Sequence, residues 1–162
     1  MTAREPSNPS VKPLPPGAPA PEMQLPDQLG SPMDLSDVDR PVLLAFHPLA
    51  WTETCEQHLD ALESRADWFQ QHDIAVFAVS VDPVPTLRAW AEALQLDFVR
   101  LLSDFWPHGA AAKAFGLFHE GAGVSERASV LIDSGGTIRL STVHAAGEAP
   151  PFDAIVDGLT GD

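Results

Sequence analysis

A single cysteine is the side chain in this sequence with the clearest capacity for covalent chemistry. Cys55 ends the run FHPLAWTETC, between an apolar segment and an amphipathic one. A thiol in the first turn of a helix lies near unpaired backbone N–H groups and the positive end of the helix dipole, and both favour the thiolate. A thiolate is a nucleophile that hydroperoxides, disulfides and electrophilic carbon can oxidise or alkylate. Because Cys55 is alone, it cannot form a disulfide within its own chain.

Two patterns compete to define the start of the helix that carries the thiol. With Thr52 as the N-cap, Cys55 occupies the third helical position. Thr54 with Gln57 also fits a capping box, which starts the helix two residues later. Both starts leave Cys55 at the mouth of the helix. Cys55 also begins an apolar stripe, so an inert, buried thiol is an equal alternative on spacing alone.

The elements that must position this thiol alternate between strands and helices. The apolar runs 41–47 and 74–81 read as strands buried on both faces, and 55–71 and 83–94 read as amphipathic helices. The turn sequence Asp133-Ser134-Gly135-Gly136 predicts a hairpin between strands 127–132 and 137–142. With a short strand at 98–102, an Ala-rich helix ending at Gly116 and a last helix at 151–159, the order is β-α-β-α-β-α-β-β-α. This order predicts an α/β, thioredoxin-like fold with a mixed central sheet and helices on both faces.

Composition narrows the class of protein. A length of 162 residues suits one domain, which we place at 17–162 after a disordered, Pro-rich N-terminal arm at 1–16. The formal net charge of −14 argues against nucleic acid and anionic membranes as partners. One cysteine excludes a disulfide framework and a cysteine-based zinc site. We find no apolar stretch that suits a signal peptide or membrane span, and we therefore expect a cytoplasmic protein.

Several segments together resemble the peroxiredoxin family. The pattern Pro48-x-x-x-Thr52-x-x-Cys55 after a buried strand is similar to the peroxidatic signature of that family, and Arg127, which opens the strand RASVLID, matches its second characteristic position. The similarity runs from Gly17 to the last helix, about nine-tenths of the chain. Two further matching segments are VSVD at 79–82 and LLSDFWPHG at 101–109, the second resembling the one-cysteine alkyl hydroperoxide reductase E group.

The resemblance implies a role for each matching residue. Cys55 would attack the terminal oxygen of a hydroperoxide and become a sulfenic acid. Thr52 would orient the peroxide, and Arg127 would stabilise the thiolate and the charge on the leaving oxygen. Pro48 would shape the loop and shield it from water. This chemistry needs no cofactor and no metal.

The sequence departs from the family pattern at two positions near the thiol. His58 stands three residues after Cys55, where many relatives carry a Glu that holds the arginine, and His47 replaces the aromatic residue usual before the proline. A histidine in such a place is more often a packed residue than a catalytic base. Two histidines beside one thiolate would nevertheless introduce pH dependence.

The resemblance also implies partners. There is no resolving cysteine, and the position five residues on is Asp60. An external thiol must therefore reduce oxidised Cys55, namely a mycoredoxin or mycothiol, a thioredoxin or a glutaredoxin. Family members pair through the surface near the active site, which predicts a homodimer through aromatic and imidazole side chains that also suit core packing: Trp51, Phe105, Trp106 and His108.

We therefore expect a cytoplasmic, antioxidant one-cysteine peroxiredoxin that reduces hydrogen peroxide and organic hydroperoxides. Two alternatives belong to other classes of protein. One is a non-enzymatic redox sensor, whose oxidised Cys55 pairs with a partner protein. The other is a thioredoxin-fold binding module whose chemistry has decayed.

Overall fold

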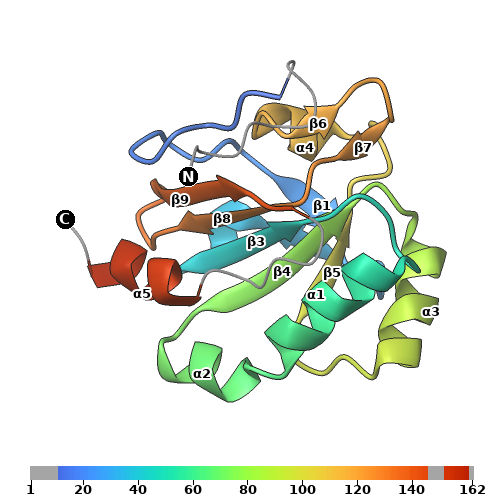
Figure 1. Cartoon of the computed structure of the whole chain (residues 1–162), viewed down its shortest axis with the longest axis horizontal. Helices are drawn as coiled ribbons and strands as arrows, with labels where there is room; N and C mark the ends of the chain where they lie inside the picture. The colour runs from blue at the N-terminus through green and yellow to red at the C-terminus, as the bar shows by residue number, and fades with distance from the viewer. Residues whose placement is uncertain (1–10, 146–151, 161–162) are drawn as a thin grey trace.

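A five-stranded mixed sheet forms the centre of the molecule (Figure 1). The computed structural model describes residues 11–145 and 152–160. The strands lie in the order β5-β4-β3-β8-β9. Strands β3, β4 and β5 are parallel, whereas β8 runs antiparallel to both β3 and β9, as the sequence predicted for a mixed sheet. The bounds of the strands are β3 (Val42–Phe46), β4 (Ala75–Ser80), β5 (Arg100–Ser103), β8 (Ala128–Ile132) and β9 (Ile138–Val143).

The apolar runs form strands because both of their faces are covered. Every residue of β3, β4 and β8 is buried. Alternate side chains enter two separate cores, since successive residues of a strand point to opposite faces. Leu44 and Phe46 of β3 join one core, and Leu43 and Ala45 join the other, together with Cys55.

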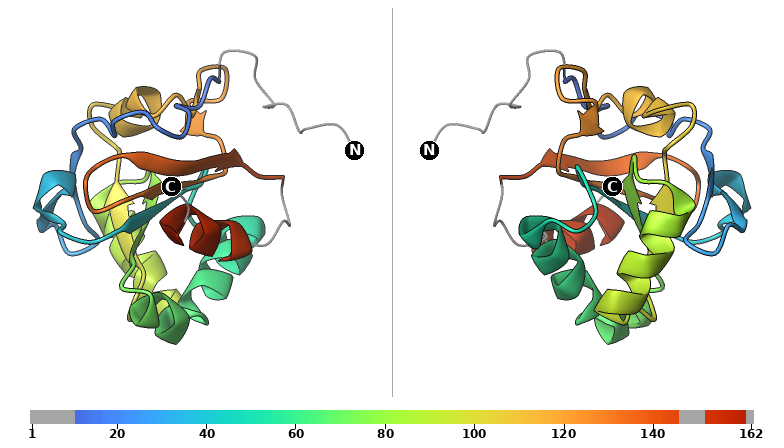
Figure 2. Two further views of the ribbon diagram at one scale, coloured as in Figure 1. Left: turned by 90° about the vertical axis from the view of Figure 1, so that its left-hand side faces the viewer. Right: turned by 90° about the vertical axis from the view of Figure 1, so that its right-hand side faces the viewer.

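Helices cover both faces of the sheet, but unequally. Figure 2 shows most of the helices on one side of the sheet and α4 on the other. The helices on the first side are α1 (Glu53–Glu63), α2 (Ala66–Gln71), α3 (Val84–Leu94) and α5 (Phe152–Thr160). The second side is closed by α4 (Ala110–Ala114) with the hairpin of β1 (Gln24–Pro26) and β2 (Pro32–Asp34).

The predicted helix over 55–71 is two helices, and it begins two residues earlier. Ser64 and Arg65 separate α1 from α2, and the hydroxyl of Ser64 donates to the carbonyl of Ala61 at 2.9 Å. Such a bond competes with the helical ladder. The carboxylate of Glu63 also accepts N–H groups of the chain approaching β5, including that of Val99 at 2.9 Å. The end of α1 is therefore tied to β5 and does not continue.

Several short elements were missing from the prediction, because they are too short to show a repeating pattern of apolar residues. They are the β1–β2 hairpin, a 3-10 turn at Leu35–Asp37, and the pair β6 (Phe118–His119) and β7 (Val124–Ser125). The strand predicted at 98–102 lies at Arg100–Ser103. The other boundaries differ from the prediction by one or two residues.

Part of the predicted arm packs on the domain. Val11 is buried, and the N–H of Leu14 donates to the carbonyl of Phe115 at 3.2 Å. Gly116 permits this approach, because a Cβ there would lie 2.0 Å from the carbonyl oxygen of Lys12. Residues 1–10 of the arm lie outside the described residues, so the arm and its boundary at 16/17 stay predictions. Among the described helices, none is both long and apolar enough to cross a membrane.

Candidate active site

The thiol of Cys55 lies in the first turn of α1, at the carboxyl end of β3. Thr52 is the N-cap residue, so Cys55 occupies the third helical position, and the alternative start at Thr54 is wrong. The first helical hydrogen bond runs from the N–H of Glu56 to the carbonyl of Thr52 at 2.9 Å. The N–H of Cys55 therefore precedes the ladder and lies at the positive end of the helix. The thiol itself is buried, with 1% of the residue exposed.

Arg127 is the side chain that meets the thiol. It lies immediately before β8, next to β3 in the sheet, and its Nη1 donates to Sγ of Cys55 at 3.3 Å. The arginine is 9% exposed. In low dielectric surroundings a guanidinium at this distance favours a negative charge on sulfur. The sheet thus joins two residues that are 72 positions apart in the sequence.

A buried carboxylate fixes the loop that precedes the helix. Asp82, just after β4, accepts the N–H of Ala50 at 2.8 Å and the hydroxyl of Ser80 at 2.6 Å. Its own carbonyl accepts the hydroxyl of Ser103 at 2.7 Å. Trp51 then takes a positive φ of 66°, which turns the chain into the helix. The loop is therefore anchored to β4 and β5 just upstream of the thiol.

Thr52 and Pro48 belong to the same loop. The hydroxyl of Thr52 donates to the carbonyl of Leu49 at 3.0 Å and makes no capping bond to the helix. Its donor is therefore occupied, while its oxygen still has lone pairs with which to accept a proton from a ligand. Pro48 is partly buried. The residue before it, His47, makes the last backbone bond to β4, from its N–H to the carbonyl of Val79 at 3.0 Å.

Three histidines surround the thiol and the arginine. His47 and His58 are buried, and burial is the main reason why the pKa of His47 falls to about 3 and that of His58 to about 4. The charge of Arg127 lowers both pKa values further. His144 faces His58 with ring centroids 5.8 Å apart and bonds Ser129 at 2.7 Å. At neutral pH His47 and His58 are therefore uncharged, which agrees with their reading as packed residues.

The arrangement suits one-step attack on a small polar molecule. A nucleophilic sulfur and a guanidinium are in contact, and both lie at the start of a helix whose first N–H groups have no partner within the helix. Within the described ranges, no group of three or more His, Cys, Asp or Glu side chains could hold a metal ion.

Aromatic side chains beside the site are exposed. Trp51 and Phe105 are about half exposed, and Trp106 is 80% exposed. These three side chains are therefore not part of the core, although the sequence also allowed core packing for them. His108 bonds the carbonyl of Gly123 at 2.7 Å through its Nε2.

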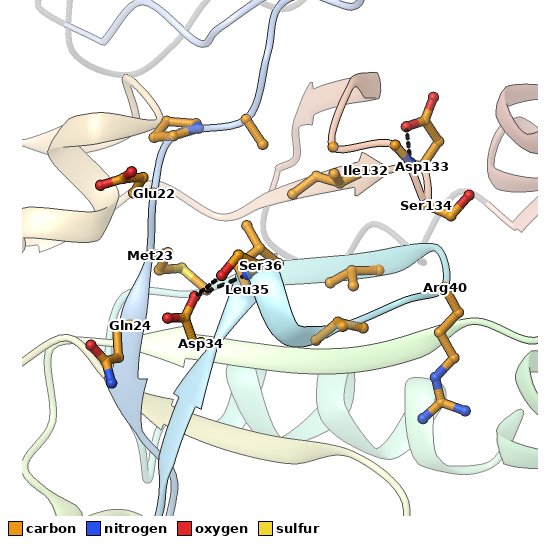
Figure 3. Close-up of a pocket in the computed structure, with 16 residues that line it drawn as sticks. Glu22, Met23, Gln24, Asp34, Leu35, Ser36, Arg40, Ile132, Asp133 and Ser134 are labelled. Atoms are coloured by element: carbon orange, nitrogen blue, oxygen red, sulfur yellow. Dashed lines mark hydrogen bonds between the residues drawn. The ribbon is translucent and has the colours of Figure 1, made fainter.

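A separate cavity of about 640 Å³ lies at the opposite end of the sheet (Figure 3). Val42 and Ile132 line it, and they are the first residue of β3 and the last of β8. In Figure 3 Asp133 and Ser134 lie across the cavity from Asp34. None of the predicted site residues lines this cavity.

The structure brings together the four predicted site residues and adds others. Cys55 and Arg127 make a direct contact, and Pro48 and Thr52 occupy the loop beside them. Sequence reasoning missed Asp82 as the loop anchor, although it lies in the matching segment VSVD. It also missed His144, for which the sequence carries no signal, because only the β8–β9 pairing brings that residue to His58.

Comparison with known proteins gives one consistent result. The profile of the AhpC/TSA family matches residues 16–141. The chain is 41% identical over 134 residues to alkyl hydroperoxide reductase E of Mycobacterium tuberculosis, covering 82% of this chain and 87% of that protein. Among solved structures, it is similar to peroxidoxin BcpB from Mycobacterium tuberculosis, with a TM-score of 0.74, 28% identity, and coverage of 88% and 91% of the two chains. A reduced 2-Cys peroxiredoxin from Plasmodium vivax gives a TM-score of 0.77 at 26% identity, covering 88% of this chain and 93% of its own.

Proposed function

The chain belongs to the AhpC/TSA family of peroxiredoxins, and we propose that it is a one-cysteine thiol peroxidase in which Cys55 reduces hydrogen peroxide and organic hydroperoxides. The observation that carries the assignment of the site is the 3.3 Å contact between Nη1 of Arg127 and Sγ of Cys55. This contact supports a thiolate at the mouth of α1, where a peroxide can meet it.

In the proposed reaction the thiolate attacks the terminal oxygen of the hydroperoxide. The S–O bond forms as the O–O bond breaks, and the leaving oxygen takes a proton to depart as water or an alcohol. Arg127 stabilises the negative charge that moves onto the leaving oxygen. Thr52 accepts a hydrogen bond from the peroxide, since its own hydroxyl proton is given to Leu49. Pro48 contributes no N–H and keeps the loop closed over the thiol.

An external thiol completes the cycle. The chain has one cysteine, so the sulfenic acid condenses with a thiol of another molecule, releasing water, and a second thiol then frees Cys55. We propose a mycoredoxin with mycothiol, a thioredoxin or a glutaredoxin as this reductant, and the cytoplasm as the reducing compartment. The exposed aromatic side chains of Trp51, Phe105 and Trp106 support a homodimer interface beside the site.

Turnover with an external reductant tests this proposal. The purified chain is mixed with excess hydrogen peroxide and each candidate reductant, and peroxide loss is followed alongside Cys55→Ser. We expect many peroxide molecules consumed per chain with at least one reductant, and none with the variant. Consumption that stops after one equivalent with every reductant would favour a redox sensor and contradict the enzyme.

A further inference from the structure

One peptide bond of the active-site loop connects Thr52 to a buried carboxylate. The peptide between Leu49 and Ala50 donates its N–H to Asp82 at 2.8 Å, and its carbonyl accepts the hydroxyl of Thr52 at 3.0 Å. A peptide unit is planar, so a bond that fixes the direction of its N–H also fixes the direction of its carbonyl. The direction of the Thr52 hydroxyl therefore depends on a side chain that follows β4.

Asp82 is itself firmly held. It is 9% exposed, and the carboxylate oxygen that accepts from Ala50 also accepts the hydroxyl of Ser80 at 2.6 Å. The backbone carbonyl of Asp82 accepts the hydroxyl of Ser103 at 2.7 Å. All three bonds are buried, and hydrogen bonds are electrostatically stronger in the interior than in water. Asp82 is therefore a fixed point against which the loop can be oriented.

The turn that carries Thr52 depends on such an anchor. Thr52 is exposed and its side chain makes no capping bond, so neither core packing nor the helix fixes its hydroxyl. Trp51, which precedes it, has a left-handed φ of 66°, a conformation that is costly for a residue with a side chain. If the Leu49–Ala50 peptide rotated, the hydroxyl would lose its acceptor and would be free to donate to the thiolate instead.

We propose that Asp82 is a positioning residue for the peroxide reaction, which orients the hydroxyl of Thr52 through the Leu49–Ala50 peptide and so leaves the oxygen of Thr52 to accept a hydrogen bond from the substrate. This inference rests on the proposed function. In this role Asp82 acts only through Thr52. The loss of rate caused by removing Asp82 must therefore disappear when residue 52 has no hydroxyl.

A double-mutant cycle of Asp82→Ala and Thr52→Val tests this dependence. Stopped-flow fluorescence follows the rate of Cys55 oxidation by hydrogen peroxide in the wild type, the two single variants and the double variant. We expect Asp82→Ala to lower the rate about tenfold when Thr52 is present, because small misplacements of an orienting group are costly. In the Thr52→Val background the same change should lower the rate by less than about twofold. A general loosening of the loop would instead give the same loss in both backgrounds.

Two further substitutions separate this hydrogen bond from charge and from stability. Asp82→Asn keeps an oxygen that can accept from Ala50, and its rate should stay within about threefold of wild type. Glu63→Ala is the matched control, because Glu63 also holds backbone N–H groups, including that of Val99 at 2.9 Å, but at the far end of α1. It should lower the free energy of unfolding and leave the oxidation rate within about twofold of wild type.

A titration of the thiol gives a readout that needs no peroxide. The chain has one cysteine and no tyrosine, so the rise in ultraviolet absorbance on thiolate formation belongs to Cys55, and Cys55→Ser supplies the baseline. Asp82→Ala should keep or lower the midpoint, since it removes a negative charge. Slower oxidation at an unchanged or lower midpoint places the defect in the reaction with peroxide.

Two results would overturn the role of Asp82 while the wild type reacts fast. One is an equal loss from Asp82→Ala in both Thr52 backgrounds, or no loss in either. The other is a raised thiolate midpoint that accounts for the whole loss. A wild-type chain that reacts with peroxide no faster than free cysteine would contradict the proposed function, and the role of Asp82 with it.

Ser80→Ala replaces Asp82→Ala in the same cycle if that variant does not fold. It removes a partner of the carboxylate, so that the bond to Ala50 is less well fixed. We expect a loss of about threefold that disappears in the Thr52→Val background. A wild-type rate in Ser80→Ala would then contradict the proposal.

Discussion

The two ends of strands β3 and β8 differ in what they contain and in what they can do. At one end, where β3 ends at Phe46 and Arg127 precedes β8, a thiol, a guanidinium and three imidazoles are buried. At the other end, Val42 and Ile132 line an open cavity of about 640 Å³. Two of the carboxylates that line that cavity have local partners: Asp34 accepts the hydroxyl of Ser36 at 2.7 Å, and Asp133 meets Arg139 at 2.9 Å.

The size of a cavity therefore does not locate the chemistry in this protein. The cavity end has room, and the carboxylates of Asp34 and Asp133 there already have partners. At the thiol end both ring nitrogens of His47 and the Nε2 of His58 are buried without a hydrogen-bond partner, and no carboxylate among the described residues forms an ion pair with Arg127. A hydroperoxide needs only a few polar contacts at its two oxygens, so buried groups with unused hydrogen-bonding capacity mark the site better than volume does.

The largest expected loss of oxidation rate follows the removal of Arg127 at the thiol end. Arg127→Ala removes the only side chain seen to donate to the sulfur within the described residues, and it should lower the second-order rate of Cys55 oxidation by about 1,000-fold. Stopped-flow intrinsic fluorescence with hydrogen peroxide measures this rate. Arg127→Lys keeps the charge without the planar fork and should recover only part of the loss. A near-normal rate in Arg127→Ala would show that Arg127 does not activate the thiol.

A smaller loss should follow Thr52→Val. This change keeps the shape of the side chain but removes the oxygen that accepts from the peroxide, and we expect a loss of about 100-fold in the oxidation rate. Thr52→Ser retains the hydroxyl and serves as the matched control. Equal rates in the valine and serine variants would exclude Thr52 from peroxide binding.

Acid should destabilise the thiol end in a different pH window from the cavity end. The pKa values of His47 and His58 are about 3 and 4 in the folded chain, against about 6.5 unfolded, so the unfolded chain binds more protons as pH falls from about 6.5 to 4. Each histidine should therefore lower the free energy of unfolding by about 3 kcal/mol as the pH falls from neutral to about 4.5. Hydrogen bonds hold the pKa values of Asp34 and Asp133 below 3.8, and their contribution is lost only at lower pH.

Denaturant unfolding at pH 7.5 and pH 4.5 tests this window. His47→Phe removes one of the buried imidazoles, so it should lose less stability between the two pH values than the wild-type chain does. Parallel losses in the two proteins would show that His47 is protonated in the folded state.

The smallest expected effect lies at the cavity. Arg40→Ala changes a residue that lines it, and the ion pair of Arg40 with Asp73, at 3.7 Å, is exposed. We expect the peroxide oxidation rate to stay within about twofold of wild type. A tenfold loss in this variant would mean that the two ends are coupled.

The sequence predicted most of the frame and the four central residues of the site, but not the residues that support them. Long apolar runs and the Gly135–Gly136 turn carry strong periodic or turn signals, so the strands and the β8–β9 hairpin were predictable. The break after Glu63 was not, because it depends on bonds from that carboxylate to the chain near Val99. Likewise, no local pattern brings His144 to His58, since sheet register alone places them together.

Intact-mass measurement after a brief, substoichiometric pulse of hydrogen peroxide shows whether Cys55 is the peroxidatic nucleophile. We expect the chain to gain one oxygen atom within seconds, peptide mapping to place that atom on Cys55, and Cys55→Ser to gain none. A wild-type chain that keeps its mass for minutes would contradict the assignment of Cys55 as the peroxidatic nucleophile.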